Sequence, residues 1–122
     1  MTAEVIVPPD TEAVVIGYLN PLVTPPVSSS VPSPRPAAFV RVTASGGEGF
    51  VGKIVHRSDV TVEAWATRRV EAFQLINECC GRLEASEVFY AEANAPSWFP
   101  DPASEMARYV AVVHLAVRGS VL

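Results

Sequence analysis

Cysteine is scarce in this 122-residue chain, and its only two cysteines, Cys79 and Cys80, are neighbours in sequence. A disulfide between adjacent residues closes a strained ring that a helix does not permit, so we expect both thiols to stay reduced. The C-x-x-C spacing typical of zinc sites is also absent. A disulfide framework is therefore excluded, and we expect Cys80 in the core and Cys79 at its edge, with no metal or catalytic role.

Cationic side chains are few. Nine Lys and Arg stand against thirteen Asp and Glu, which gives a net charge of −4 and an isoelectric point near 5.1. Proteins that bind by neutralising phosphates have the opposite balance, so nucleic-acid binding is disfavoured. No run approaches the ~20 apolar residues of a membrane span, and residues 1–4 lack the basic start of a signal peptide. We expect a soluble, cytosolic protein with no membrane partner.

Catalytic signatures are missing as well. There is no G-x-S-x-G elbow, and the carboxylates, Glu63 among them, are expected on solvated helix and strand faces. The glycines of residues 47–52 match G-x-G-x-x-G, but strands are expected on both sides, whereas a dinucleotide cradle leads into a helix. We expect His114 to be a satisfied neutral imidazole on a buried strand and His56 to be exposed. The sequence predicts no enzyme, no catalytic residue, no cofactor and no metal.

Apolar residues, by contrast, are abundant for the length. They make up 49% of the chain, and the mean hydropathy is +0.26. The length suffices for one domain and is too short for two ordinary ones. A single domain of this size buries only about two thirds of its unfolded surface, so its interior cannot hide every apolar side chain. We expect one domain, residues 1–122, with part of its apolar surface covered by another chain.

Proline marks the borders of the expected elements. Eight of the eleven prolines lie within residues 8–36 and three within residues 96–102. Residues 37–95 thus lack the residue that interrupts helices and inner strands, and should hold most of the regular structure.

The proline-rich N-terminal part predicts a helix and a short strand. The helix should begin at Asp10 or Thr11, either of which can cap it, and stop before Pro21. Residues 24–36 are rich in Pro and Ser, and the apolar alternation that starts at Val27 predicts a short edge strand followed by an extended linker.

A hairpin is predicted next. Residues 38–45 alternate, with Val40 and Val42 on one face and Phe39 and Arg41 on the other. Glycine-rich residues 46–49 should then reverse the chain into a second strand that runs to Ala66. In that second strand Trp65 lies on the face opposite Val60 and Val62, so it should face away from the helices and need cover.

The remaining pattern predicts one helix and two strands. The helix spans Thr67 to about Ala85, and its apolar stripe comprises Val70, Phe73, Ile76, Cys80 and Leu83. Strands are predicted over residues 88–93 and 108–118, separated by a loop over residues 94–102. The last strand is apolar on both faces, and Val112 and His114 lie on the second. The predicted fold is α+β, a small mixed, mainly antiparallel sheet with two helices packed on one face.

Four features are candidates for contact with a partner: the loop with Trp98, the ring of Trp65, the glycine-rich segment and the second face of the last strand at Val112. Trp98 and Phe99 lie in the last loop, either folded back as a lid or presented to another protein. The glycine-rich segment is either a plain exposed turn or a mobile tip that orders on contact. The candidate interface residues are Gly46, Gly47, Glu48, Gly49, Trp65, Trp98, Phe99 and Val112.

Three stretches also carry a family resemblance. They are RPAAFVRVTASGG, then RSDVTVEAWA leading into an Arg-rich helix start, and finally RYVAVVHLAVRGSVL. With the opening helix and the V-P-x-P-R-P segment at residues 31–36, they make the chain resemble the tail terminator proteins of long-tailed (siphovirus-type) bacteriophages of actinobacterial hosts. The resemblance covers nearly the whole chain and consists of small apolar and turn residues.

The resemblance implies a structural virion protein. Tail terminators are small α+β domains that assemble as a ring, usually of six copies, on the last ring of tail tube protein. The ring stops tube growth and offers a surface to the head-completion, or stopper, protein. The implied partners are therefore further copies of the chain and these two proteins, in the neck region of a virion made in the host cytoplasm. DNA would pass through an acidic or neutral lumen without specific binding.

Two other functions remain open. One is a different neck or head-tail connector ring protein that never touches the tube. The other is a soluble ligand-binding or enzymatic α+β domain with its pocket under the Trp98 loop.

Overall fold

The computed structural model describes residues 3–122, which form two helices and two sheets. The helices are α1 (Thr11–Leu19) and α2 (Arg69–Glu84). The main sheet contains β2 (Val27–Ser28), β3 (Ala38–Val51), β4 (Val55–Ala66), β5 (Tyr90–Ala93), β6 (Ser97–Trp98) and β7 (Ala107–Arg118). The short strands β1 (Ile6–Val7) and β8 (Ser120–Val121) pair with each other.

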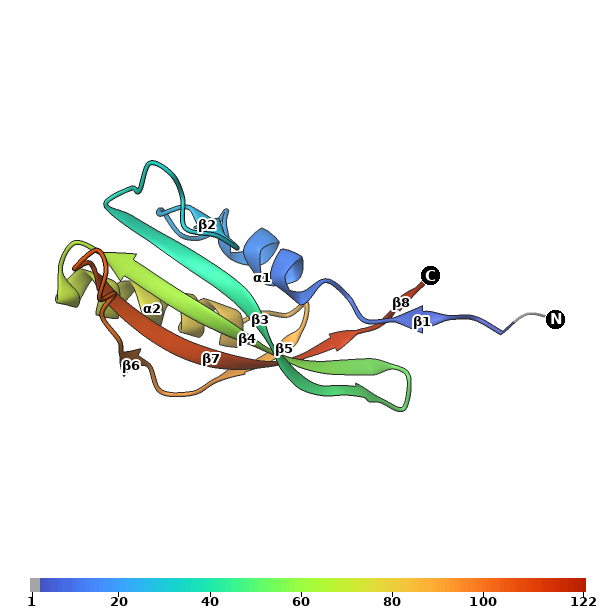
Figure 1. Cartoon of the computed structure of the whole chain (residues 1–122). Coiled ribbons are helices and arrows are strands. Elements are labelled where there is room, and N and C mark those ends of the chain that lie inside the picture. The colour runs from blue at the N-terminus through green and yellow to red at the C-terminus, as the bar shows by residue number, and fades with distance from the viewer. Residues whose placement is uncertain (1–2) are drawn as a thin grey trace.

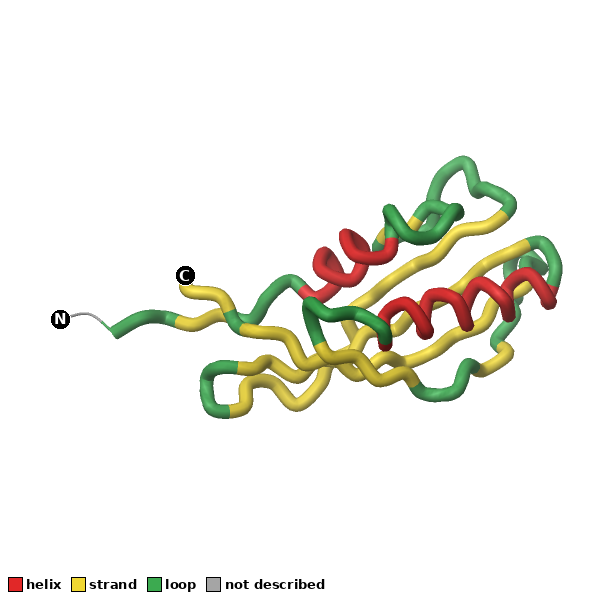
Figure 2. Tube along the Cα trace, turned by 180° about the vertical axis from the view of Figure 1, so that it is seen from behind, coloured by secondary structure: helices red, strands yellow, loops and turns green. Residues whose placement is uncertain are grey.

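The main sheet has the strand order β2-β3-β4-β7-β5, and β6 also pairs with β7. Only the β2–β3 pair is parallel among the strand pairs described, so the sheet is mixed and mainly antiparallel. Both helices lie on one face of it (Figures 1 and 2). The predicted α+β fold class is confirmed.

The core lies between this helix-covered face and the two helices. Strand alternation sends Val42, Val62 and Val113 inward, where each is fully buried. Val15 of α1 and Ile76 of α2 cover them and are fully buried as well. Burying each of these side chains stabilises the fold by about 1.5–3 kcal/mol, so both helices are held mainly by this sheet face.

The first helix begins as its sequence predicts. The Asp10 side chain accepts a hydrogen bond from the Ala13 amide at 3.0 Å, which satisfies one of the free N–H groups at the helix start. The helix ends at Leu19, before Pro21, as expected.

The second helix begins two residues later than predicted and ends at Glu84, and its buried stripe contains three of the five predicted residues, Ile76, Cys80 and Leu83. Val70 and Phe73, predicted to face the core, are exposed, whereas Ala72 and Cys79 are fully buried. The buried positions recur at 72, 76, 79 and 83, which is a regular helical spacing, and Val70 and Phe73 lie off this line. Cys79 therefore lies in the core and not at its edge.

The glycine-rich segment is part of a strand, which contradicts the predicted turn and mobile tip. The β3–β4 pairing continues through Gly46 and Gly49, with shifts of register between Ala44 and Gly46 and between Gly46 and Gly49. These shifts are β-bulges, which use the positive φ angles that glycine adopts readily. The chain reverses instead at Gly52 and Lys53, where φ is +63° and +62° as a tight hairpin turn requires.

The last strands match the sequence pattern closely. The strand predicted over residues 88–93 is β5, which begins two residues later, and the one predicted over residues 108–118 is β7. The intervening loop contains the short strand β6, which the sequence did not indicate, because Pro96 and Pro100 flank it.

The molecule has an arm, defined here as residues 50–56 of the β3–β4 hairpin together with residues 5–7 and 120–122, which include β1 and β8. Figure 1 shows the hairpin tip and both chain ends beyond the helices, at the same end of the molecule. The hairpin and the terminal strands are packed together, because the Gly119 amide donates to the Ile54 carbonyl at 3.0 Å. The ring of His56 packs edge-on against Phe50, so His56 is half-buried and not exposed as predicted.

Candidate functional site

The sheet face without helices is divided into a closed end and an open groove. Alternation places Thr61 and Glu63 of β4, and Val112 and His114 of β7, on this face. Val112 is half-buried there, opposite Thr61 in the neighbouring strand, and His114 is exposed. The face of β7 that carries Val112 and His114 is thus the sheet face that the helices leave open.

The closed end surrounds Trp65, whose side chain is only 2% exposed. Phe39 stacks on the Trp65 ring with 4.9 Å between the centroids. The guanidinium groups of Arg35 and Arg108 lie over the same ring, 5.5 and 4.9 Å from its centroid. Trp65 does face away from the helices, but its own chain covers it, so the expectation that a partner covers it is wrong.

A buried carboxylate holds this closed end together. Glu63 accepts hydrogen bonds from the Trp65 indole at 3.2 Å, from Arg41 at 3.3 Å and from Arg108 at 3.4 Å. A carboxylate removed from water needs such charged and polar partners, because its desolvation is costly. The expectation of a solvated Glu63 is therefore wrong, since its two arginine partners come from other strands far away in sequence.

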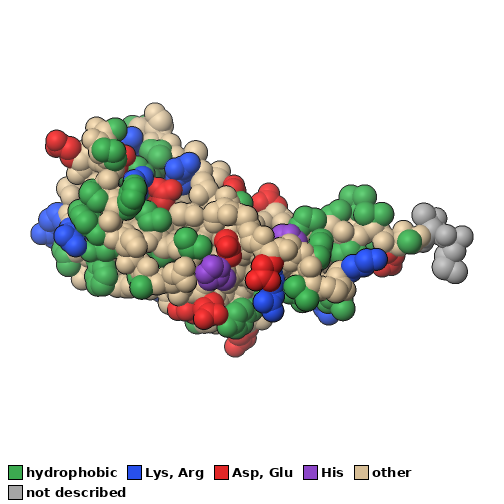
Figure 3. Space-filling view, turned by 60° about the horizontal axis from the view of Figure 1, so that its bottom comes forward, with side chains coloured by type: hydrophobic (Ala, Val, Ile, Leu, Met, Phe, Trp, Pro, Cys, Tyr) green, Lys and Arg blue, Asp and Glu red, His purple; other side chains and the backbone are tan. Residues whose placement is uncertain are grey.

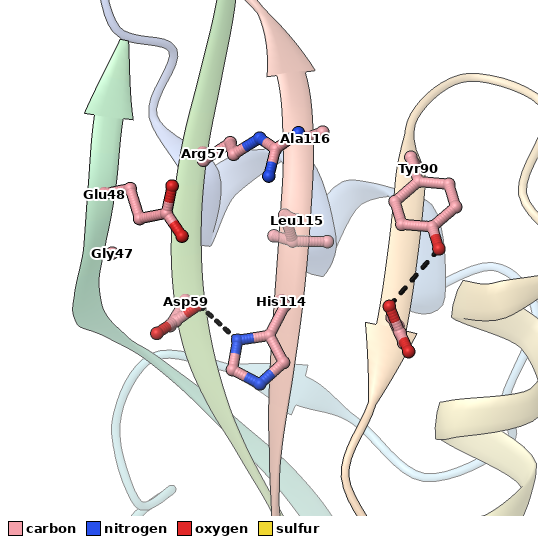
Figure 4. A pocket seen from close by; sticks show the side chains of 9 residues that line it. Gly47, Glu48, Arg57, Asp59, Tyr90, His114, Leu115 and Ala116 are labelled. Carbon is pink, nitrogen blue, oxygen red and sulfur yellow. Dashed lines mark hydrogen bonds and ion pairs between the residues drawn. The ribbon is translucent and has the colours of Figure 1, made fainter. Parts of the chain in front are cut away.

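The open groove crosses the other end of this face and has a volume of about 820 Å³ (Figure 4). Strands β3, β4, β7 and β5 contribute its walls. Three carboxylates, those of Glu48, Asp59 and Glu92, surround it, and Arg57 is the single guanidinium in its lining. Figure 3 shows acidic side chains gathered near a histidine on this side of the molecule. The groove is therefore acidic.

Two hydrogen bonds order the groove wall. The His114 Nδ1 lies 2.6 Å from the Asp59 carboxylate, and the Tyr90 hydroxyl donates to Glu92 at 3.3 Å (Figure 4). His114 is thus satisfied, as expected, but it is exposed and not buried. The prediction failed because the alternation of β7 gave no sign of which face the helices leave open.

The bulges of β3 shape one side of the groove. Gly47 lies so close to β4 that an added Cβ would stand 2.4 Å from the Ser58 Cα and 2.7 Å from the Arg57 carbonyl oxygen. Gly47 and Glu48 line the groove, whereas Gly46 and Gly49 supply the bends on either side. The glycine-rich segment thus brings the predicted candidate residues to this site through strand curvature.

A second surface, the aromatic corner, lies where α2 begins and β6 pairs with β7. It comprises Arg69, Phe73, Trp98 and Tyr109. The residue after Trp98, Phe99, lies instead against Arg108, whose guanidinium is 5.1 Å from its ring centroid. The rings of Phe73 and Trp98 each lie 5.2 Å from that of Tyr109, and the Arg69 guanidinium lies 4.4 Å above Trp98. Trp98 covers its own domain with one side of its ring yet is 37% exposed, and Phe99 is 60% exposed. The sequence pointed to these two residues but not to Arg69 or Phe73.

Both cysteines are buried in the core. Burial raises the pKa of Cys79 to about 12 and that of Cys80 to about 11, because a thiolate is poorly solvated there. At neutral pH both thiols stay protonated and are therefore poor nucleophiles.

Two carboxylates accept hydrogen bonds from backbone amides at the edges of the sheet. Glu12 accepts a hydrogen bond from the Ala44 amide of β3 at 2.7 Å, and Glu84 accepts one from the Ala93 amide of β5 at 3.2 Å. Side chains that cap edge amides hinder the addition of a further strand. The sheet face that the helices leave open and the arm are thus more available for contact than these two edge positions.

Neither protein-family models nor curated proteins give a match to this chain. Within residues 3–122 no helix is long and apolar enough to cross a membrane. In the same part of the chain no three His, Cys, Asp or Glu side chains are grouped as metal ligands would be.

Proposed function

We propose that this protein is a structural virion protein that closes the phage tail tube as a ring, ends tube polymerisation and presents the surface for head-tail joining. The family resemblance of the sequence motivates the proposal, and the α+β fold with two helices on one face of the main sheet is compatible with it. On this account the chain acts by binding and not by catalysis.

The observation that carries the proposal is the arm. It extends beyond the helix-covered body (Figure 1), and five of its large apolar side chains are exposed. They are Val5, Val51, Ile54, Val121 and Leu122. Apolar side chains gathered on a projecting hairpin mark a contact with another protein, since a monomer gains nothing from exposing them.

The arm suits an axial contact with the tube. A paired hairpin held by two further strands is a stiff projection, so it can reach the neighbouring ring without a large loss of conformational entropy. The body would then form the ring, and its far surface would meet the head-completion protein. The net charge of −4 favours a lumen through which DNA moves without binding.

Polymerisation of purified tail tube protein tests the proposal. The wild-type protein should shorten the tubes in proportion to its concentration. Ile54→Asp places a charge in the arm contact and should abolish this effect. Val88→Asp is the matched control, because Val88 is also a large exposed apolar residue but lies outside the arm.

Equal tube lengths with and without the wild-type protein would overturn the proposal. A ring that binds the head-completion protein but leaves tube growth unchanged would indicate a neck connector instead. Equal capping by the wild type and by Ile54→Asp would show that the arm is not the tube contact.

A further inference from the structure

Two surfaces of this chain carry opposite charges that are not compensated within it. At the aromatic corner, Arg69 donates to the Tyr109 hydroxyl at 3.1 Å, and among residues 3–122 no carboxylate forms an ion pair with it. At the groove, Glu48 and Glu92 likewise form no ion pair within the described chain, and together with Asp59 they outnumber Arg57, the one guanidinium in the lining.

The aromatic corner also holds its arginine in a fixed position. The Arg69 guanidinium is fixed over Trp98, and the exposed ring of Phe73 packs on the same Tyr109 ring to which Arg69 donates. An arginine already ordered by an aromatic ring loses little freedom on binding, and such residues often dominate interfaces. The corner therefore presents a preorganised cation among apolar rings.

The groove has the size and the lining to accept the side chains of the aromatic corner. Its volume of about 820 Å³ is within the range of sites that enclose a drug-sized molecule, so it has room for more than one large side chain. Its wall offers the exposed ring of Tyr90 and the methyl group of Ala116 (Figure 4). Glu48 of β3 and Glu92 of β5 lie on opposite sides, because β4 and β7 separate these two strands. An apolar group flanked by a cation fits this lining.

The corner and the groove of one copy cannot meet. Both lie along β7, the corner at Tyr109 and the groove at His114 to Ala116, about 20 Å apart in an extended strand. Because both are built on one rigid sheet, a contact between them requires a second copy of the chain.

We infer that the aromatic corner of one copy inserts into the acidic groove of the next, with Arg69 between Glu48 and Glu92. This inference rests on the proposed ring and assigns its subunit contact. Because the two surfaces differ, each copy uses both, and a head-to-tail contact of this kind closes into a ring when the rotation permits.

Charge reversal tests the contact. Arg69→Glu makes the corner acidic, and Glu48→Arg with Glu92→Arg makes the groove basic. Each variant alone should self-associate about tenfold more weakly than the wild type, because like charges meet. An equimolar mixture should assemble again, with the two variants alternating, since each corner then meets a groove of opposite charge. Arg82→Glu, elsewhere on α2, is the control and should assemble normally.

Native mass spectrometry at low salt, with tail tubes added as a template in a parallel series, measures composition and size. Circular dichroism confirms that each variant is folded. Recovery of alternating assemblies supports the inference. Unimpaired assembly of the single variants, or no recovery on mixing, overturns it.

Cross-linking provides a second measurement that does not depend on charge reversal. Copies carrying Phe73→Cys are mixed with copies carrying Glu92→Cys and treated with a short bis-maleimide, which leaves the buried native thiols unmodified. A cross-link between the two variants, but not within either alone, is expected. If the protein caps tubes without this cross-link, the inference fails and the proposed function stands. If the cross-link forms but tubes are not capped, the contact stands and the proposed function fails.

Discussion

Replacing Gly47 by alanine tests whether the bulge in β3 shapes the groove. The φ angle of Gly47 is +125°, which a residue with a side chain adopts only with strain of about 1–3 kcal/mol. The new Cβ would also meet the backbone of Ser58 at 2.4 Å. Backbone atoms in a paired strand cannot move aside cheaply, so overpacking adds about 1–3 kcal/mol. The free energy of unfolding should fall by about 2–6 kcal/mol in all.

Two further glycines provide controls. Gly46 has a φ of +105° but no atom within 4 Å of an added Cβ, so Gly46→Ala should cost only the strain of about 1–3 kcal/mol. Gly17 lies on the exposed side of α1 with free space around it, so Gly17→Ala should stabilise the protein by about 0.5–1 kcal/mol. Urea unfolding followed by tryptophan fluorescence measures all three. A Gly47→Ala variant as stable as Gly46→Ala would refute the close approach of the two strands.

Three more experiments test buried or hydrogen-bonded side chains. Glu63→Ala leaves Arg108 without its carboxylate and should lower the unfolding free energy by about 2–4 kcal/mol. A loss of less than about 0.5 kcal/mol, measured by urea unfolding, would contradict the buried pairing. Cys79 and Cys80 should not react with a thiol reagent at pH 8 until the protein unfolds, because burial keeps both pKa values above that pH; rapid reaction of the folded protein would show accessible thiols. The pKa of Asp101 is lowered, chiefly by its hydrogen bond from the side chain of Ser104, so the stability it contributes should be present above the usual carboxyl pKa and be lost as the pH falls through its lowered value. Asp101→Asn should flatten that part of the acid unfolding curve, and an unchanged curve would count against the bond.

The sequence predicted the parts of the fold that depend on neighbours along the chain. The cap at Asp10 and the end of α1 before Pro21 follow from local rules for helix ends. The alternation around Val42 and Val62 shows which side chains share a strand face. These signals suffice for two helices on one face of an antiparallel sheet.

The sequence did not predict features that depend on distant residues. Gly46 and Gly49 suit a turn and a bulge equally well, and only the pairing with β4 decides between them. The burial of Glu63 depends on Arg41 and Arg108, which lie on two other strands.

The candidate site was predicted in part for the same reason. Gly47, Glu48 and Trp98 were recognised from composition and placement in a loop or turn. Arg69 carries no local signal, because only the fold brings it over Trp98.

Electron microscopy of preformed tail tubes mixed with the purified protein tests the central claim most directly. The account predicts a ring of copies at one end of each tube, seated through the arm, and tubes that no longer lengthen from that end when more tube subunits are added. Bare tube ends that grow as fast with excess protein as without it would contradict the account.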